Sequence, residues 1–149
     1  MDLVIKHFSE LTADELYEIY RARVAVFVVE QRCAYQDVDD DDRRSYHFWI
    51  SDNSKLVAYL RLIVRDRESG FVRVGRVLSL RRREGLAKKL VSEAVAFAKD
   101  RLDAKEIDLD AQTYVRAFYE SLGFEVLGEE FLEDGIPHIA MRLSLKNSH

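Results

Sequence analysis

The chain has 149 residues, of which 48% are hydrophobic and 34% are charged, and its formal net charge is −4. This length predicts one domain over residues 1–149, and the acidic balance argues against a general nucleic-acid-binding role. The single cysteine, Cys33, excludes an internal disulfide and a cysteine-cluster metal site.

The chain begins with a predicted strand and a predicted helix. Residues 3–8 alternate as a strand, and Thr12 and Glu15 then form a capping box that begins the helix. An apolar helical face follows at Leu16, Ile19, Tyr20, Arg23 and Phe27. The segment 26–31 at its end is unusually apolar, and the sequence leaves open whether this segment is buried helix or strand.

Residues 37–42 form the most acidic run of the chain. The alternate aspartates resemble a calcium-binding loop, but such a loop needs glycine at its sixth position and glutamate at its twelfth. Asp42 and Phe48 stand at those positions. We therefore expect a solvated acidic loop without a metal, on the rim of a cleft that attracts a cationic substrate.

The middle of the chain predicts a meander of strands followed by a crossover. Residues 47–50, 55–64 and 71–79 read as strands joined by short turns, which makes neighbouring strands antiparallel. A helix from residue 85 to residue 101 and a strand at 107–111 follow, and such a strand–helix–strand unit joins parallel strands. The predicted sheet is therefore mixed.

The last part of the chain predicts a short helix and two strands. The helix covers residues 113–122 and ends at Gly123, and a strand follows at about 124–127. The last strand alternates from residue 139 to residue 145. The Asp134-Gly135 pair precedes it, but the gap between the two predicted strands is too long for a tight two-residue hairpin.

The junction between the strand at 71–79 and the following helix is a candidate phosphate site. It contains Arg81, Arg82 and Arg83, followed by Gly85. The first N–H groups of a helix lack partners at the positive end of its dipole, and arginine adds a planar charged fork. Neither a Walker A loop nor a Gly-x-Gly-x-x-Gly fingerprint is present. The alternative is an ordinary turn with solvated arginines.

Residues 82–87 fit the pattern Arg/Gln-x-x-Gly-x-Gly/Ala, which resembles the pyrophosphate-binding signature of the GNAT acetyltransferases. Residues 111–112 and 117–124 resemble that family's Phe-Tyr-x-x-x-Gly-Phe segment. Residues 27–31 and 134–139 are similar to its ElaA-like branch. The resemblance spans nearly the whole chain and implies an α/β fold of the GNAT type, with a mixed, mostly antiparallel sheet flanked by helices.

This resemblance implies an N-acetyltransferase that uses acetyl-CoA, needs no metal and acts in a ternary complex. The pantetheine arm would lie between the fourth and fifth strands, which splay apart in the family, and the diphosphate would lie over the first amides of the next helix. The implied acetyl-CoA-binding residues are Val77, Leu78, Ser79, Arg82, Arg83, Glu84, Gly85, Leu86, Ala87, Lys88 and Phe118. The connection before Arg82 is shorter than in the family, which leaves open which backbone groups of residues 77–79 contact pantetheine.

Tyr119 matches the family's general acid, which would protonate the departing thiolate of CoA. A backbone N–H near Val77 or Leu78 would stabilise the oxyanion that forms when an amine attacks the thioester. The alternative for Tyr119 is a packed aromatic ring whose hydroxyl bonds a backbone carbonyl. Cys33 could act as a nucleophile in principle, but a direct transfer needs none.

The sequence does not identify the acceptor or the general base. Glu30, Asp37, Glu133 and His138 are candidate substrate residues, because they flank segments expected near the acceptor cleft. The expected partner is a small-molecule amine or a protein amino group, not a nucleic acid or a membrane, and the final strands could pair in a homodimer. A non-catalytic acyl-CoA-binding module is the alternative function. The cytoplasm is the expected location, because neither a signal peptide nor a run of about twenty apolar residues is visible.

Overall fold

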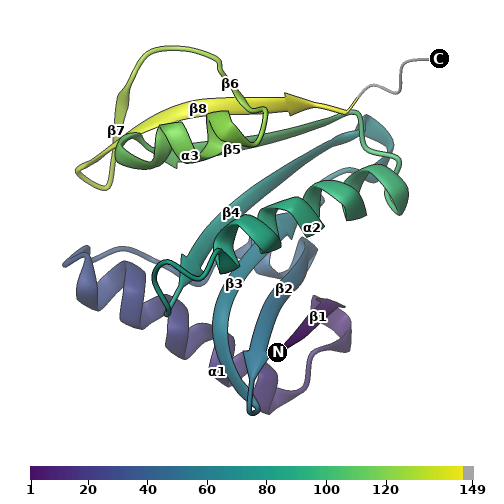
Figure 1. Ribbon diagram of the computed structural model, residues 1–149, viewed down its shortest axis with the longest axis vertical. Helices are drawn as coiled ribbons and strands as arrows, with labels where there is room; N and C mark the ends of the chain where they lie inside the picture. Colours follow the sequence, from purple (N-terminus) through teal and green to yellow (C-terminus); the bar gives the residue numbers. More distant parts are fainter. Residues whose placement is uncertain (146–149) are drawn as a thin grey trace.

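The computed structural model describes residues 1–145 and shows a mixed sheet with helices on both faces (Figure 1). Its strands are β1 (Asp2–His7), β2 (Ser45–Asp52), β3 (Lys55–Ile63), β4 (Phe71–Ser79), β5 (Glu106–Gln112), β6 (Glu125–Val126), β7 (Phe131–Glu133) and β8 (Ile136–Ser144). Its longer helices are α1 (Ala13–Arg23), the π-helix η2 (Val24–Glu30), α2 (Leu86–Asp100) and α3 (Arg116–Ser121). Short 3₁₀ turns lie at Phe8–Glu10 (η1), Asp40–Arg44 (η3), Arg67–Ser69 (η4) and Thr113–Val115 (η5).

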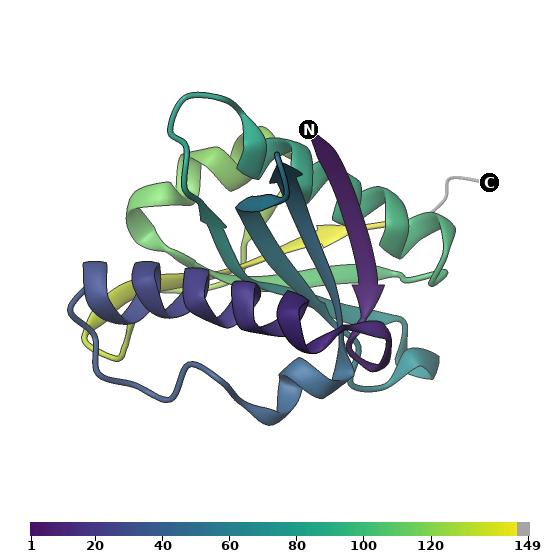
Figure 2. The ribbon, with the colours of Figure 1, turned by 90° about the horizontal axis from the view of Figure 1, so that it is seen from below.

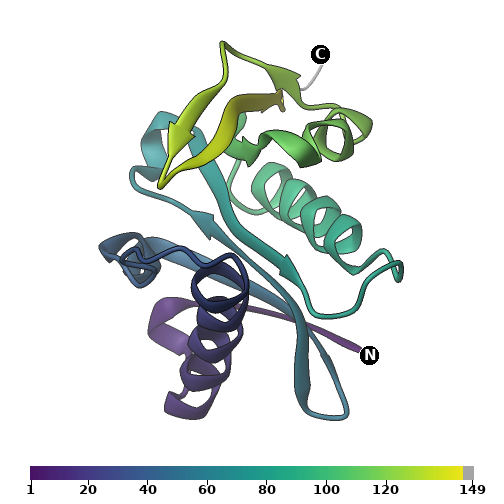
Figure 3. The ribbon, with the colours of Figure 1, turned by 90° about the vertical axis from the view of Figure 1, so that its left-hand side faces the viewer.

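The strand order is β1-β2-β3-β4-β5-β8-β6, and β7 also pairs with β8. Every neighbouring pair is antiparallel except β4 with β5. This arrangement confirms the predicted mixed sheet, its meander and its parallel crossover. Figure 3 shows α1 on one face of the sheet and α2 and α3 on the other. A large hydrophobic cluster therefore lies beneath α2 and a smaller one beneath α1. Within residues 1–145, no helix is long and apolar enough to cross a membrane.

Helix α1 begins at the predicted capping box. The Glu15 amide donates to the Thr12 hydroxyl over 3.1 Å, and the Glu15 carboxylate accepts from the Thr12 amide over 2.9 Å. After Arg23 the helix continues as the π-helix η2. The apolar segment that the sequence left open is therefore helical, in a wider form that is rare and frequently lies at functional sites. Figure 2 shows the chain after η2 returning alongside α1 towards β2.

Helix α2 packs on the sheet through its predicted apolar face. Leu90, Val91, Ala94 and Ala98 are fully buried in the large cluster. Burying one leucine completely contributes about 2 kcal/mol, so this face anchors the helix firmly. The anchored face fixes where the first turn of α2 lies relative to β4.

Strands β4 and β5 form a parallel pair only at their beginnings. Phe71 pairs with Glu106, and the last paired residues are Arg73 and Asp108. Beyond that pair the two strands diverge, as Figure 1 shows. The divergence agrees with the splayed strands that the family resemblance implies.

A β-bulge in β4 coincides with this divergence. Between Gly75 and Leu78 the register advances three residues on β4 and only two on β3. Arg76 has a left-handed φ of 52° there, which costs a non-glycine residue roughly 1–2 kcal/mol. The extra residue turns the side chains that follow it to the opposite face of the sheet. Val74 accordingly lies in the cluster under α2, and Leu78 lies in the cluster under α1.

The C-terminal part differs from the sequence-based expectation. Strand β7 is not among the predicted strands, because its residues Phe131-Leu132-Glu133 are too few to show a periodic pattern. The prediction that Asp134-Gly135 is not a tight hairpin is wrong, since Glu133 pairs with Ile136 across these two residues. Their φ values of 51° and 76° are both left-handed, as a type I′ turn requires.

Candidate active site

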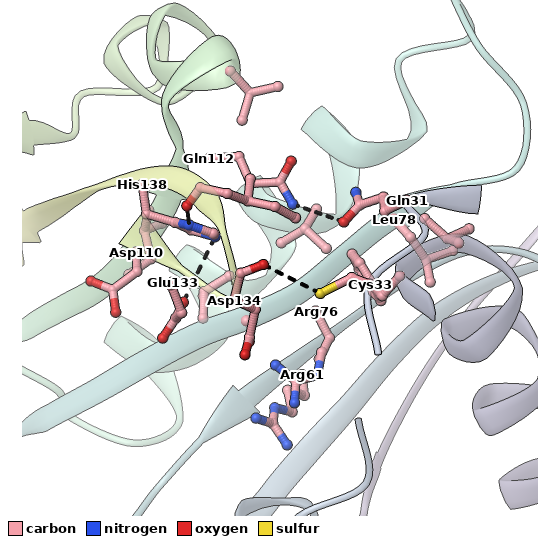
Figure 4. A pocket seen from close by; sticks show the side chains of 18 of the residues that line it. Gln31, Cys33, Arg61, Arg76, Leu78, Asp110, Gln112, Glu133, Asp134 and His138 are labelled. Atoms are coloured by element: carbon pink, nitrogen blue, oxygen red, sulfur yellow. Dashed lines mark hydrogen bonds and ion pairs between the residues drawn. The ribbon is translucent and has the colours of Figure 1, made fainter. Parts of the chain in front are cut away.

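A cavity of about 1190 Å³ occupies the region where β4 and β5 diverge. Figure 4 shows side chains from several elements around it. The residues on the α2 and α3 side are Arg82, Ala87, Tyr114, Val115, Phe118 and Tyr119, and those on the side of η2 and the β7–β8 hairpin are Phe27, Glu30, Gln31, Cys33, Tyr35, Glu133, Asp134 and His138. The divergence of the strands therefore places groups from both faces of the sheet around one space.

The edge of β4 that faces β5 lines the middle of the cavity from Val74 to Ser79. Because the pairing with β5 stops at Asp108, this edge has no strand partner within residues 1–145 beyond that point. A ligand with amide groups can pair with such an edge as an added strand does. The Ser79 hydroxyl is used locally, since it donates to the carbonyl oxygen of Arg81 over 2.7 Å.

The first turn of α2 borders the cavity through Ala87. Its N-cap is Gly85, whose φ of 69° is left-handed, and no side chain caps the helix. The first amides of a helix of 15 residues are thus left without a side-chain acceptor, at the positive end of the dipole. Arg82 lies beside them, 89% exposed, with only a long ion pair of 3.7 Å to Glu30. This arrangement suits a bound phosphate or diphosphate.

Tyr119 of α3 lines the cavity with only 6% of its surface exposed. Its ring packs edge-on against Phe118 and Phe124, with ring centroids 5.0 Å and 5.8 Å apart. Burial raises the pKa of the Tyr119 phenol, and the neighbouring Tyr114 raises it further. Within residues 1–145 no hydrogen bond involves this hydroxyl, so the alternative in which it bonds a backbone carbonyl is not seen.

Two contacts bridge the divided sheet on the α1 side of the cavity (Figure 4). The side-chain amide of Gln112, at the end of β5, donates to the side-chain oxygen of Gln31 over 3.2 Å. The Cys33 thiol lies 3.6 Å from the carbonyl oxygen of Asp134. The segment after the π-helix is therefore joined to both β5 and the β7–β8 hairpin, and it closes this side of the cavity.

The expectation of a solvated acidic loop is wrong for Asp37 and Asp42, which are 4% and 1% exposed. Arg23 is fully buried between them, with 3.1 Å from Nε to Asp37 Oδ2 and 2.6 Å from Nη1 to Asp42 Oδ1. Arg61 donates to Asp39 over 2.6 Å and to Asp42 over 3.0 Å. These aspartates neutralise Arg23 of α1 and Arg61 of β3 and do not form a free acidic rim.

The same network holds the bulge of β4. The Nε of Arg76 lies 3.0 Å from Asp37 Oδ1, and its Nη2 donates to the Asp37 carbonyl oxygen over 2.8 Å. The guanidinium lies over the ring of Tyr35, 5.3 Å from its centroid. These contacts offset the backbone strain at Arg76 and fix its side chain at the cavity wall.

We expect acid to destabilise the fold through this network. Hydrogen bonds from Arg65 hold the pKa of Asp41 below its usual value; at Asp39 burial raises the pKa, but the bonds and charge of Arg61 outweigh it and lower the net pKa. Carboxylates with a depressed pKa stabilise the fold above about pH 4 and lose that contribution as the pH falls through the folded-state pKa. Urea unfolding across this range should therefore show a fall in the free energy of unfolding. The fall should be shallower in Asp41→Asn than in Asp40→Asn. Equal falls in both variants contradict the claim that the depressed pKa of Asp41 contributes to the loss of stability in acid.

The structure brings many of the predicted site residues together. Those that line the cavity are Glu30, Val77, Leu78, Ser79, Arg82, Ala87, Phe118, Tyr119, Glu133 and His138. The others lie elsewhere: Arg83, Glu84, Gly85 and Lys88 are exposed around the start of α2, Leu86 is in the core, and Asp37 is in the buried ion-pair network. No group of three or more His, Cys, Asp and Glu side chains in the described part of the chain is arranged to hold a metal ion.

Sequence reasoning missed Arg61, Arg76 and Tyr35 as cavity residues. A signal for Arg61 exists, because it interrupts an otherwise apolar and buried strand between Leu60 and Leu62. A charge in such a strand requires a buried partner. No local pattern identifies the other two, since their positions depend on the bulge and on the loop after η2.

Comparison with known proteins gives a consistent result. The chain matches the family model described as an acetyltransferase (GNAT) domain over residues 9–145. Protein ElaA of Escherichia coli is 40% identical over 139 residues, which cover 91% of this chain and 91% of that protein. A UPF0039 protein of Schizosaccharomyces pombe is 42% identical over 149 residues, which cover 97% and 98% of the two chains. The crystal structure of an acyl-CoA N-acyltransferase from Pseudomonas aeruginosa matches with a TM-score of 0.88 and 40% identity, covering 97% of this chain and 100% of that one.

Proposed function

Because the chain belongs to the GNAT acetyltransferase family, we propose that it transfers an acetyl group from acetyl-CoA to an amine of a small molecule or of a protein. One observation carries this proposal. The cavity at the divergence of β4 and β5 has the start of α2, which no side chain caps, on one side. On the other side it has polar side chains of η2, of the loop after η2 and of the β7–β8 hairpin. A thioester donor and an amine acceptor entering from these two sides would meet in the middle.

The α2 side of the cavity fits acetyl-CoA, which supplies an activated acetyl thioester. The amides of Leu86 and Ala87 would hold the diphosphate, with Arg82 beside it. The open edge of β4 between Val77 and Ser79 would bond the amides of pantetheine. Both features are formed by the chain itself, since no side chain caps the helix and the strand edge is unpaired within residues 1–145.

Tyr119 would protonate the departing thiolate. The raised pKa of its buried phenol keeps it protonated at neutral pH, as a general acid requires. A backbone amide near Val77 or Leu78 would stabilise the oxyanion. Cys33 has no role in this reaction, because its thiol is directed at the Asp134 carbonyl and a ternary-complex transfer forms no enzyme-bound acetyl group.

Arg82→Ala should weaken the binding of CoA about tenfold, because one charge-assisted hydrogen bond to a phosphate contributes roughly 1.5 kcal/mol or more. The binding of pantetheine, which has no diphosphate, should not change. Isothermal titration of both ligands measures the difference. Arg21→Ala, an exposed arginine on α1, is the matched control and should bind CoA as the wild type does.

A titration in which the wild type binds no CoA overturns the proposed function. If CoA binds, the release of CoA thiol from acetyl-CoA is followed with propylamine, spermidine and a lysine-containing peptide. Amine-dependent thiol release supports an enzyme. Tight binding without thiol release for every amine supports the alternative, a module that only binds acyl-CoA.

A further inference from the structure

His138 is held at the cavity in one orientation. Its Nδ1 lies 2.7 Å from the backbone carbonyl oxygen of Ile136, and Phe131 stacks on its ring with centroids 6.0 Å apart. A carbonyl oxygen can only accept, so Nδ1 carries the proton of the neutral ring and Nε2 keeps its lone pair. The residue is 9% exposed and lines the cavity. The Nε2 atom is therefore a fixed proton acceptor.

The Nε2 atom faces the carboxylate of Glu133. The distance from Nε2 to Glu133 Oε2 is 3.7 Å, which is too long for a hydrogen bond. When the ring is neutral, His138 Nε2 and Glu133 Oε2 both accept hydrogen bonds and cannot bond each other. Only a third group that donates to both atoms can bridge them. The tight Asp134-Gly135 turn holds β7 and β8 side by side and thereby places the two side chains next to each other (Figure 4). The gap between them fits an N–H donor such as an ammonium group.

The charges around this gap favour a cation. The arginines that line the same side of the cavity already have carboxylate partners, in the pairs Arg61–Asp39, Arg65–Asp41, Arg73–Asp110 and Arg76–Asp37. Within residues 1–145 no lysine or arginine forms an ion pair with Glu133 or Asp134, and Gln112, opposite His138 on β5, is uncharged. Negative charge is therefore left over at the hairpin.

We propose that His138 is the general base for the acceptor amine and that Glu133 binds the amine as its ammonium ion. The inference rests on the proposed acetyl transfer. The ammonium gives one proton to Nε2, and the freed lone pair of the nitrogen forms the bond to the acetyl carbon to give the tetrahedral oxyanion. Collapse of this oxyanion then breaks the carbon–sulfur bond. The nitrogen then loses its second proton to solvent, Tyr119 protonates the thiolate and is reprotonated from solvent, and His138 releases its proton. The products are an amide, the CoA thiol and one proton.

The acetyl-transfer assay uses two amines that differ in their need for a base. Propylamine is an ammonium ion at neutral pH, whereas trifluoroethylamine is largely neutral. His138→Asn should lower kcat/KM for propylamine about 100-fold or more, the usual contribution of a general base. The same variant should lose much less kcat/KM for trifluoroethylamine, which needs no base to become neutral. The asparagine amide can still donate to the Ile136 carbonyl, so this variant keeps the local structure and removes only the base.

Glu133→Gln should raise the KM for propylamine several-fold and leave that for trifluoroethylamine unchanged, because only the first carries a charge. Glu130→Gln is the matched control, since Glu130 is exposed in the preceding loop and does not line the cavity. Equal losses for both amines in His138→Asn and Glu133→Gln overturn the inference, since they indicate a structural role alone.

A measurement without turnover separates this inference from the proposed function. Nitrogen-15 spectra of the histidine rings in the wild-type protein should show His138 in the Nδ1–H form when neutral, and added propylammonium should shift its Nε2 signal. Assignment comes from the His138→Asn spectrum. An Nε2–H form, or no shift on addition, overturns the inference even if acetyl transfer occurs. If CoA binds but neither amine is acetylated, the proposed function fails and the spectra alone decide whether an ammonium binds here.

Discussion

Tyr119→Phe should lower kcat by about 10²- to 10⁴-fold, the usual contribution of a general acid. Acetyl-CoA binding and thermal unfolding should stay as in the wild type, because phenylalanine keeps the ring contacts with Phe118 and Phe124. The hydroxyl has no hydrogen-bond partner within residues 1–145, so its removal leaves no buried group unsatisfied. Thiol release at saturating acetyl-CoA and amine measures kcat, and calorimetric titration measures binding.

Tyr114→Phe is the matched control for this experiment. Tyr114 also lines the cavity, but it is 78% exposed. Its variant should retain the wild-type kcat. Normal turnover in Tyr119→Phe would show that another group protonates the thiolate, and a lowered melting temperature would show that the hydroxyl is structural.

Arg23→Met should lower the free energy of unfolding by about 3–5 kcal/mol, the usual effect of removing one partner from a buried ion pair. Arg23 is fully buried, and the carboxylates of Asp37 and Asp42 would stay buried without it. Methionine fills a similar space with a flexible apolar chain, so the loss reports mainly on charge. Urea unfolding at neutral pH provides the measurement.

Arg65→Met tests whether burial sets this energy. Arg65 bonds Asp41 through two hydrogen bonds of 3.1 Å and 2.8 Å, but its side chain is 54% exposed. Exposed pairs contribute at most about 1 kcal/mol, because water screens them. A loss in Arg65→Met as large as that in Arg23→Met contradicts the distinction.

The parts of the fold that follow from the sequence have local signals. The capping box of Thr12 and Glu15 marks the start of α1, and the spacing of Leu86, Leu90 and Ala94 marks the buried face of α2. The turn that begins α2 is likewise marked by a pattern of consecutive residues, 82–87. Such signals involve residues one or two turns apart, and tertiary contacts do not override them here.

The parts that the sequence did not reveal depend on contacts between distant segments. Asp42 reads as solvated because its cations, Arg23 and Arg61, are each 19 residues away. Both cations were visible as charges in apolar surroundings, one on a helix face and one in a strand, and a charge in such a position predicts a buried partner. Strand β7 is recognisable only through its pairing with β8, and the sequence pattern does not distinguish the π-helix from an α-helix.

The single extra residue at Arg76 reverses the alternation of side chains along β4, so the two halves of the strand turn their apolar residues to opposite faces of the sheet. The half that is paired with β5 presents Val72 to the α2 layer, and the half beyond the bulge presents Leu78 to the α1 layer. The second half therefore packs against the α1 layer at the place where it no longer pairs with β5. The bulge and the packing of Leu78 in the α1 layer therefore build the opening into the sheet itself, and a ligand that lies in it replaces no strand pairing.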